Sequence, residues 1–151
     1  MNFPFEIITH SASQTEEVGK ELASQILSDN LPRFVAMYGD LGVGKTAFVR
    51  GFCSVLCPDS TVKSPTFALV NEYRCAAGTN TIKKVCHFDM YRVTDEDDLY
   101  SIGFYDYLRD DILCIAEWCE LIPYALPEQL LKVSVEKLGF ENDRKITVTI
   151  E

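Results

Sequence analysis

The chain has 151 residues, 47% of them hydrophobic and 25% charged, which is the size and composition of one globular domain spanning residues 1–151. Its net charge of −9 disfavours unaided binding to nucleic acid, because a protein that grips phosphates usually carries the opposite sign. No apolar run approaches membrane-spanning length and the N-terminus lacks a signal-peptide pattern, so we expect a cytoplasmic protein that does not contact a membrane.

The chain begins with an expected strand and helix. Residues 5–9 are predicted to form a short strand. Ser13, followed three residues later by Glu16, fits a capping box, so we expect the helix to begin at this serine. Apolar residues then recur at helical spacing until about Ser28, and the polar, proline-containing stretch 29–32 is expected to end the helix.

Residues 39–46, Gly-Asp-Leu-Gly-Val-Gly-Lys-Thr, fit the phosphate-binding pattern G-x-x-x-x-G-K-[ST]. An apolar run of strand length, 33–38, precedes it, and apolar residues at helical spacing follow it over 46–56. The glycines allow backbone N–H groups to cradle a triphosphate, Lys45 reaches the β- and γ-phosphates, and Thr46 offers a hydroxyl to Mg²⁺. The predicted phosphate-binding residues are Gly39, Asp40, Leu41, Gly42, Val43, Gly44, Lys45, Thr46 and Ala47, with the Asp40 side chain pointing outward.

The segment after this helix contains a second region of interest. Thr66, in Ser-Pro-Thr-Phe at 64–67, belongs either to a loop that senses the γ-phosphate and Mg²⁺ or to a plain turn that enters a strand. Residues 68–74 and 81–88 are predicted to form a β-hairpin around a turn at 76–80. A hairpin inside an α/β chain indicates a mixed sheet.

The rest of the chain supplies a helix start, a buried strand and an antiparallel pair. An acidic stretch, 94–98, is typical of a solvated helix N-terminus. The continuous apolar run 112–116 suits a strand buried on both faces. Short helices or turns are expected at 105–109 and 121–126, and alternating strands at 132–137 and 145–150.

Two carboxylates follow strand-like apolar segments. Asp89 and Glu117 are each expected at the carboxyl edge of the sheet, where open α/β sheets bind ligands. Either can hold Mg²⁺ while the other orients the attacking water; a turn role for Asp89 and an exposed strand end for Glu117 are the alternatives. His87 is expected to be a satisfied structural histidine. Trp118 is expected either to pack in the core or to contact a base or a partner.

Four segments stand together in a recognisable order: 39–46, 64–67, His-Phe-Asp-Met-Tyr-Arg at 87–92, and Glu-Trp at 117–118. The sequence thereby resembles the TsaE-type (YjeE) ATPase family of tRNA threonylcarbamoyladenosine (t6A) biosynthesis, over about residues 5–120. Phe67 often appears as tyrosine in that family, which leaves the aromatic character intact.

The resemblance implies a P-loop NTPase-like, three-layer α/β/α fold with a mixed, mostly parallel sheet. It implies a slow ATPase that uses ATP and Mg²⁺, is stimulated by TsaB- and TsaD-type partners, and contacts tRNA mainly through them. By the same resemblance, the catalytic residues are Lys45, Asp89 and Glu117, and the metal-side residues are Thr46, Asp89 and Glu117. Two further cofactor-binding residues are implied: Thr66, in a switch-like loop, and Trp118, near the nucleotide or the partner surface.

Other nucleotide-dependent functions make different demands on the sequence. A small-molecule kinase usually needs an arginine-bearing lid, whereas the arginines here are scattered and no lid-like insertion is apparent. A regulatory GTPase needs an N/T-K-x-D motif, which the sequence lacks. A nucleotide-dependent binding module without useful turnover remains an alternative. Without an evident arginine finger in the chain, we expect a partner protein to complete the catalytic site.

Overall fold

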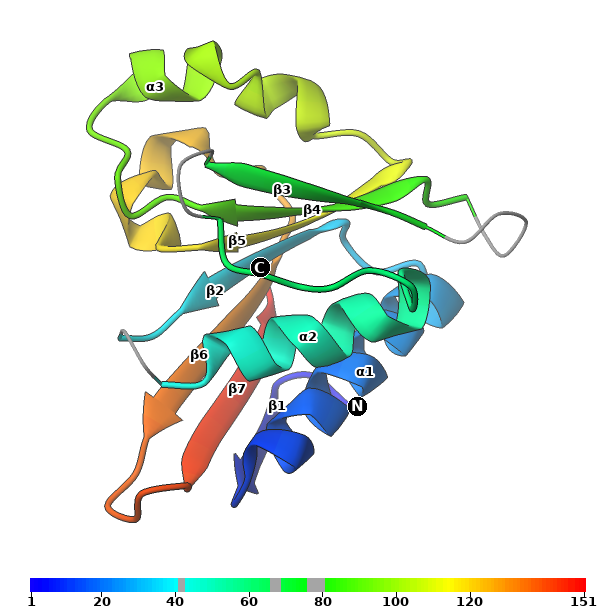
Figure 1. Ribbon diagram of the computed structural model, residues 1–151, viewed down its shortest axis with the longest axis vertical. Coiled ribbons are helices and arrows are strands. Elements are labelled where there is room, and N and C mark those ends of the chain that lie inside the picture. The colour runs from blue at the N-terminus through cyan, green and yellow to red at the C-terminus, as the bar shows by residue number, and fades with distance from the viewer. Residues whose placement is uncertain (41–42, 66–68, 76–80) are drawn as a thin grey trace.

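The structure is a computed structural model, and it describes residues 1–40, 43–65, 69–75 and 81–151. Strands and helices alternate through the first part of the chain, and two strands end it (Figure 1). In chain order the elements are β1 (Phe5–Thr9), α1 (Ala12–Asp29), β2 (Phe34–Tyr38), α2 (Lys45–Leu56), β3 (Val70–Arg74), β4 (Lys84–Asp89), α3 (Glu96–Ser101), the 3₁₀ helix η1 (Phe104–Tyr107), β5 (Ile112–Glu117), the 3₁₀ helices η2 (Cys119–Leu121) and η3 (Pro123–Ala125), β6 (Leu131–Lys137) and β7 (Arg144–Ile150).

The strands form one seven-stranded sheet in the order β1-β7-β6-β2-β5-β4-β3. The four central strands, β6, β2, β5 and β4, run parallel to one another. Antiparallel pairs extend the sheet on both sides: β3 joins β4, and the β6–β7 hairpin carries β1. The predicted mixed sheet, its hairpin strands and its terminal antiparallel pair are therefore confirmed. The expected turn at 76–80 lies outside the described residues.

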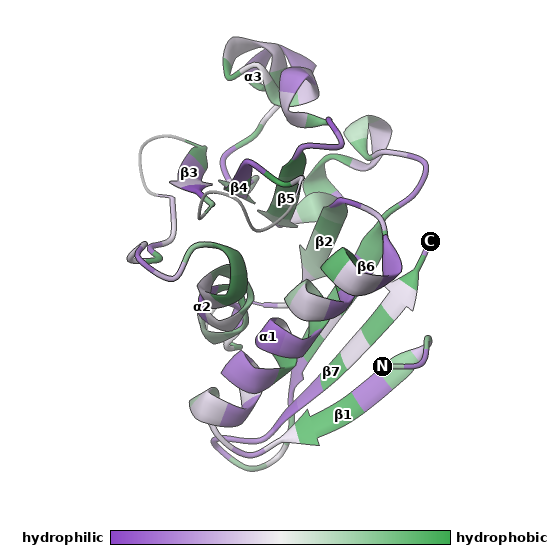
Figure 2. Cartoon of the chain, turned by 90° about the vertical axis from the view of Figure 1, so that its right-hand side faces the viewer, coloured by the Kyte–Doolittle hydropathy of each residue, from purple (hydrophilic) through white to green (hydrophobic). Residues whose placement is uncertain are grey.

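Helices cover both faces of the sheet, which gives the expected three layers. The long helices α1 and α2 lie together on one side of the twisted sheet, while α3 and the 3₁₀ helices pack on the other (Figure 2). Successive side chains of a strand point to opposite faces of the sheet, so each central strand contributes residues to the hydrophobic core on both faces. On β2, Val35 and Met37 face α1 and α2, whereas Phe34 and Ala36 face the opposite layer.

Helices α1 and α2 approach each other closely through two glycines. A Cβ atom added at Gly51 would lie 2.0 Å from the carbonyl oxygen of Glu16, and one at Gly19 would lie 2.3 Å from that of Phe48. Arg50 and Glu16 form an ion pair across the same contact at 2.8 Å. The glycines thus bring the helix that begins at the phosphate loop tightly against α1.

The predicted start of α1 was wrong by two residues. Ser11, not Ser13, is the N-cap: its backbone is extended (φ −157°) and its hydroxyl accepts a hydrogen bond from the Gln14 N–H at 3.1 Å. The Gln14 side chain in turn accepts from the His10 N–H at 2.6 Å. Two Ser-x-x-Glu/Gln patterns overlap in this stretch, and the earlier one forms the cap. Among the described helices, none combines the length and apolar character needed to cross a membrane.

Candidate nucleotide site

The phosphate loop connects the carboxyl end of β2 to the start of α2. Two glycines in it have backbone angles that other residues rarely adopt: Gly39 at φ 145° and Gly44 at φ 101°. A Cβ atom at Gly39 would also lie 2.5 Å from the carbonyl oxygen of Val135. Because Gly44 is the N-cap of α2, no capping side chain competes for the first N–H groups of that helix. Such a helix start is suited to binding phosphate.

Lys45, the first residue of α2, lies at the centre of the site and is 5% exposed. Its Nζ donates a hydrogen bond to the carbonyl oxygen of Gly39 at 2.7 Å. The same ammonium lies 3.9 Å from Oε1 of Glu117 and 4.5 Å from the centroid of the Trp118 ring. The loop lysine and the end of β5 are therefore in contact.

The sheet brings the two predicted carboxylates side by side. Asp89 ends β4 and Glu117 ends β5, and they are directly opposite each other in the parallel register. Glu117 is also opposite Met37 on β2, the strand that leads into the phosphate loop. Since Met37 and Ile115 face α1 and α2, alternation directs both carboxylates toward the layer that contains α2.

Glu117 does not stand at an exposed strand end, which was the alternative to a functional role. It is 6% exposed, and its second carboxylate oxygen, Oε2, lies 2.6 Å from Nε2 of His87 on β4. His87 is fully buried and was expected to be a satisfied structural residue. It instead pairs with the candidate catalytic glutamate, and its Nδ1 has no hydrogen-bond partner among the described residues.

Asp89 and Thr46 lie at the more open part of the site. Asp89 is half-buried, and its Oδ1 accepts a hydrogen bond from the Tyr91 N–H at 3.0 Å, so it does take part in a turn. The Thr46 hydroxyl lies 3.5 Å from that of Ser64, which brings the second predicted segment to the start of α2. Asp40 is exposed, as expected. Leu41, Gly42 and Thr66 lie outside the described residues.

These residues fit a magnesium ion bound together with phosphate. Thr46, Asp89 and Glu117 offer hydroxyl and carboxylate oxygens, the ligands that Mg²⁺ prefers. Within the described ranges, no cluster of three or more His, Cys, Asp or Glu residues could enclose a metal ion. This donor set suits Mg²⁺ in the manner typical of nucleotide sites, where one or two carboxylates act with substrate phosphates and water.

Trp118 forms one wall of the site. It has a positive φ of 60°, uncommon for a tryptophan, at the turn that follows β5. Its ring is half-buried against Lys45 and lies 5.0 Å from the ring of Tyr91, which is exposed.

The next residue, Cys119, is buried, and burial raises the pKa of its thiol to about 12. Its thiol therefore stays protonated near neutral pH.

Arg144 reaches the phosphate loop from the terminal hairpin and was missed as a site residue. Its Nε donates to the carbonyl oxygen of Val43 at 2.7 Å, while its Nη1 donates to the carbonyl oxygens of Glu141 and Asp143. The two partners are 101 residues apart in sequence, so no local pattern indicates the contact. The segment after residue 128, which carries no recognised motif, thus supports the loop.

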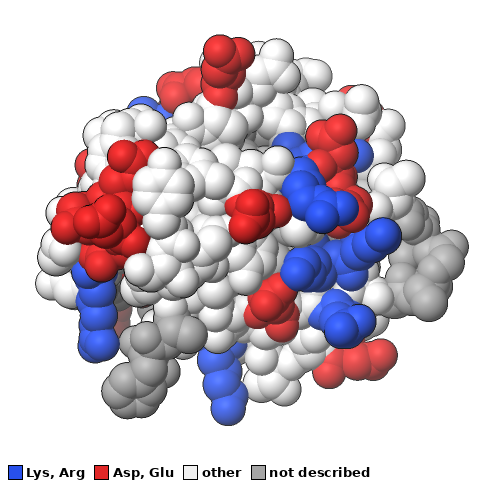
Figure 3. Space-filling model, turned by 90° about the horizontal axis from the view of Figure 1, so that it is seen from above, with Lys and Arg blue, Asp and Glu red and all other residues white. Residues whose placement is uncertain are grey.

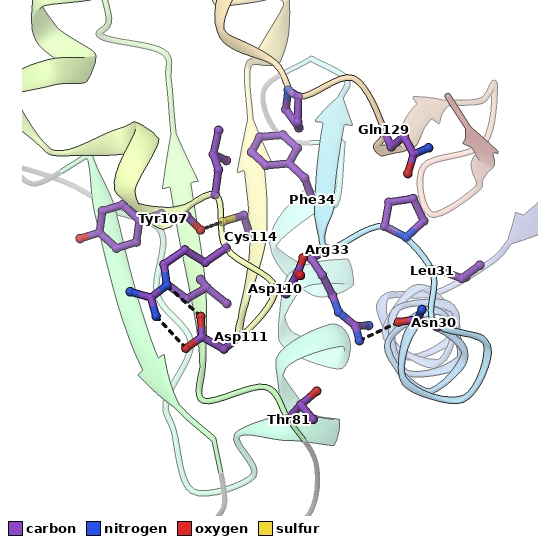
Figure 4. A pocket seen from close by; sticks show the side chains of 15 residues that line it. Asn30, Leu31, Arg33, Phe34, Thr81, Tyr107, Asp110, Asp111, Cys114 and Gln129 are labelled. Atoms are coloured by element: carbon purple, nitrogen blue, oxygen red, sulfur yellow. Dashed lines mark hydrogen bonds and ion pairs between the residues drawn. The ribbon is translucent and has the colours of Figure 1, made fainter.

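A separate cavity lies at the opposite edge of the sheet. It has a volume of about 620 Å³ and lies beside Phe34 and Ile112, the first residues of β2 and β5 (Figure 4). Both of its arginines already have partners, since Arg109 pairs with Asp111 and Arg33 donates a hydrogen bond to Asn30. The carboxyl ends of these strands, which hold the phosphate loop and both carboxylates, are therefore the better candidate site.

Comparison with known proteins agrees with the family resemblance found in the sequence. The family described as threonylcarbamoyl adenosine biosynthesis protein TsaE matches residues 9–146. A tRNA threonylcarbamoyladenosine biosynthesis protein TsaE from Haemophilus influenzae is 37% identical over 120 residues, covering 78% of this chain and 73% of the relative. The one from Bacillus subtilis is 34% identical, covering 76% and 68%. The crystal structure of Bacillus YdiB superposes with a TM-score of 0.70 at 23% identity, covering 97% of this chain and 86% of YdiB, and so supports the fold.

Proposed function

The chain belongs to the TsaE family of tRNA threonylcarbamoyladenosine biosynthesis proteins, and from that premise we propose that it is a Mg²⁺-dependent ATP-binding protein and slow ATPase. It supports the t6A modification of tRNA in the cytoplasm. The observation that carries this proposal is the meeting of Lys45 and Glu117 at 3.9 Å, where the phosphate loop adjoins the carboxyl end of β5. Lys45, which would bind phosphate, and Glu117, which would bind the metal ion or the attacking water, then line the same site.

Each residue has a proposed role in this reaction. Backbone N–H groups at the start of α2 and the Lys45 ammonium bind the phosphates. Thr46, Asp89 and Glu117 provide oxygen atoms on the metal side, and bound Mg²⁺ supplies charge neutralisation of the phosphate oxygens. Asp89 or Glu117 orients the attacking water. Glu117 lies in the drier part of the site, where electrostatic interactions are stronger.

We propose that hydrolysis is stimulated by partner proteins of the TsaB and TsaD types, which also hold the tRNA. Acidic side chains gather on the side of the surface formed by α3 (Figure 3), whose first turn and N-cap contain Asp95, Glu96, Asp97 and Asp98. Such a surface would repel a nucleic-acid backbone. A protein partner is therefore the better match for this side of the molecule.

The test is ATP hydrolysis by the purified chain alone and with the TsaB- and TsaD-type proteins of the same organism. We expect weak, Mg²⁺-dependent hydrolysis alone and a marked increase with the partners, both lost in Lys45→Ala. Partners that bind the ATP-loaded protein without changing its rate would contradict stimulation. ATP consumption only in the presence of a small phosphate acceptor would instead indicate a kinase.

A further inference from the structure

The hydrogen bond between the buried side chains of His87 and Glu117 has a defined donor and a defined acceptor. Nε2 of His87 lies 2.6 Å from Oε2 of Glu117, and both side chains are almost wholly shielded from water. A carboxylate oxygen can only accept, so Nε2 carries the hydrogen and donates it. Nδ1 has no partner among the described residues, and a hydrogen there would be a buried donor left unsatisfied. The hydrogen bond therefore identifies Nε2, the ring nitrogen that faces Glu117, as a nitrogen that carries a hydrogen.

This hydrogen bond restrains a flexible side chain at the centre of the site. Glu117 ends β5, and the backbone turns immediately at Trp118 with φ 60°. With Oε2 held by His87, the other oxygen, Oε1, is left facing Lys45 at 3.9 Å. The histidine thus fixes which carboxylate oxygen points toward the phosphate loop and which points into the sheet.

We propose that His87 is a positioning residue that orients Glu117 for nucleotide hydrolysis. The proposal rests on the proposed ATPase function but concerns a residue that acts through the glutamate. His87 lies two residues before Asp89 on the same face of β4, so β4 contributes both a candidate metal-side carboxylate and the group that orients the second one. Groups that orient catalytic ligands typically contribute about 10- to 100-fold to activity.

The first test compares two substitutions of His87. His87→Leu removes the donor, whereas His87→Gln retains an N–H donor at similar reach. With the partner proteins present, we expect His87→Leu to lower kcat by about 10- to 100-fold with a much smaller change in the KM for ATP, and His87→Gln to recover part of the loss. In a Glu117→Ala background, His87→Leu should cause no further loss. Equal, additive losses in both backgrounds would overturn the proposal.

A second test does not depend on ATPase activity. The chain has only two histidines, so His10→Gln leaves His87 as the single imidazole in a nitrogen-15 NMR spectrum. We expect His87 to be protonated on Nε2 in the wild type and to lose that preference in Glu117→Ala. Protonation on Nδ1, or an unchanged spectrum in Glu117→Ala, would overturn the pairing. If the spectra agree but the wild type with partners hydrolyses no ATP, the ATPase proposal fails while the histidine–glutamate pairing stands.

Discussion

Arg144 holds the phosphate loop from the other end of the chain, through a hydrogen bond from its Nε to the carbonyl oxygen of Val43 at 2.7 Å. Val43 is 5% exposed, so loss of the arginine would leave a nearly buried carbonyl unsatisfied. The contact joins the first residue of β7 to the candidate phosphate loop. Through this contact, the terminal β6–β7 hairpin supports the candidate nucleotide site.

Arg144→Ala is therefore expected to lower the free energy of unfolding by about 1 to 3 kcal/mol and to weaken ATP binding. Chemical denaturation and calorimetric titration with ATP measure the two effects. Arg109→Ala is the matched control, because Arg109 pairs at the surface with Asp111, far from the loop, and should cost less than about 1 kcal/mol. Unchanged ATP affinity in Arg144→Ala would show that the hairpin does not support the loop.

Asp89→Asn tests the metal side of the site without disturbing the turn. Asparagine keeps an Oδ1 that can accept the hydrogen bond from the Tyr91 N–H, yet it removes the negative charge. We expect a similar melting temperature, a higher Mg²⁺ requirement and a loss of hydrolysis of about tenfold or more. Asp106→Asn, at an exposed position in η1, is the control. Wild-type magnesium dependence in Asp89→Asn would exclude Asp89 from the metal site.

Gly51→Ala tests the close packing between α1 and α2. The added Cβ would lie 2.0 Å from the carbonyl oxygen of Glu16, so the two helices must move apart. Overpacking of this kind costs about 1 to 3 kcal/mol of stability, measurable as a lower denaturation midpoint. Gly139→Ala is the matched control, since nothing lies within 4 Å of its added Cβ. Equal stability of the two variants would contradict the described approach of the helices.

The reactivity of the cysteines follows from their pKa values. Cys57 and Cys75 face each other with 3.8 Å between sulfur atoms, and the hydrogen bond from Cys57 lowers the pKa of the Cys75 thiol. Burial raises the pKa of Cys53 and Cys86 to about 12. A lower pKa means more thiolate at a given pH, so Cys75 should react first with iodoacetamide near neutral pH.

Peptide mass mapping after brief alkylation identifies the modified residue. Cys57→Ala removes the donor, so it should slow alkylation of Cys75 and shift its pH dependence to higher pH. Cys57→Ser keeps a hydroxyl donor and is the control. Preferential labelling of Cys53 or Cys86 would contradict the assignment.

The sequence was sufficient for most elements and for the positions of Lys45, Asp89 and Glu117 on them, because these depend on local patterns. The glycine-rich loop between an apolar run and a helical pattern predicted the β2–α2 connection. Apolar runs ending in Asp89 and Glu117 predicted two strands with their carboxylates at one edge, and the parallel register bears this out. Because the two strands run parallel and their side chains alternate between the faces of the sheet, the side chains of Asp89 and Glu117 lie on the same face.

Contacts between distant segments could not be predicted in the same way. The buried Glu117 pairs with His87, which is 30 residues earlier, and a histidine flanked by apolar residues gives no sign of its partner. The Arg144–Val43 contact depends on β7 pairing with β6, which in turn pairs with β2. The start of α1 was missed for a local reason: two capping patterns overlap, and Ser11 rather than Ser13 has the extended backbone of an N-cap.

Trp118 offers a direct optical test of phosphate binding at Lys45. It is the single tryptophan of the chain, and the Lys45 ammonium lies 4.5 Å from the centroid of its ring. Phosphates that draw this cation away should alter the indole emission, so we expect a saturable fluorescence change on titration with ATP and Mg²⁺. Lys45→Ala should abolish the change, and adenosine, which lacks phosphates, should not produce it. An equal response to adenosine would instead mean that the base contacts Trp118 directly and that the lysine is not the source of the signal.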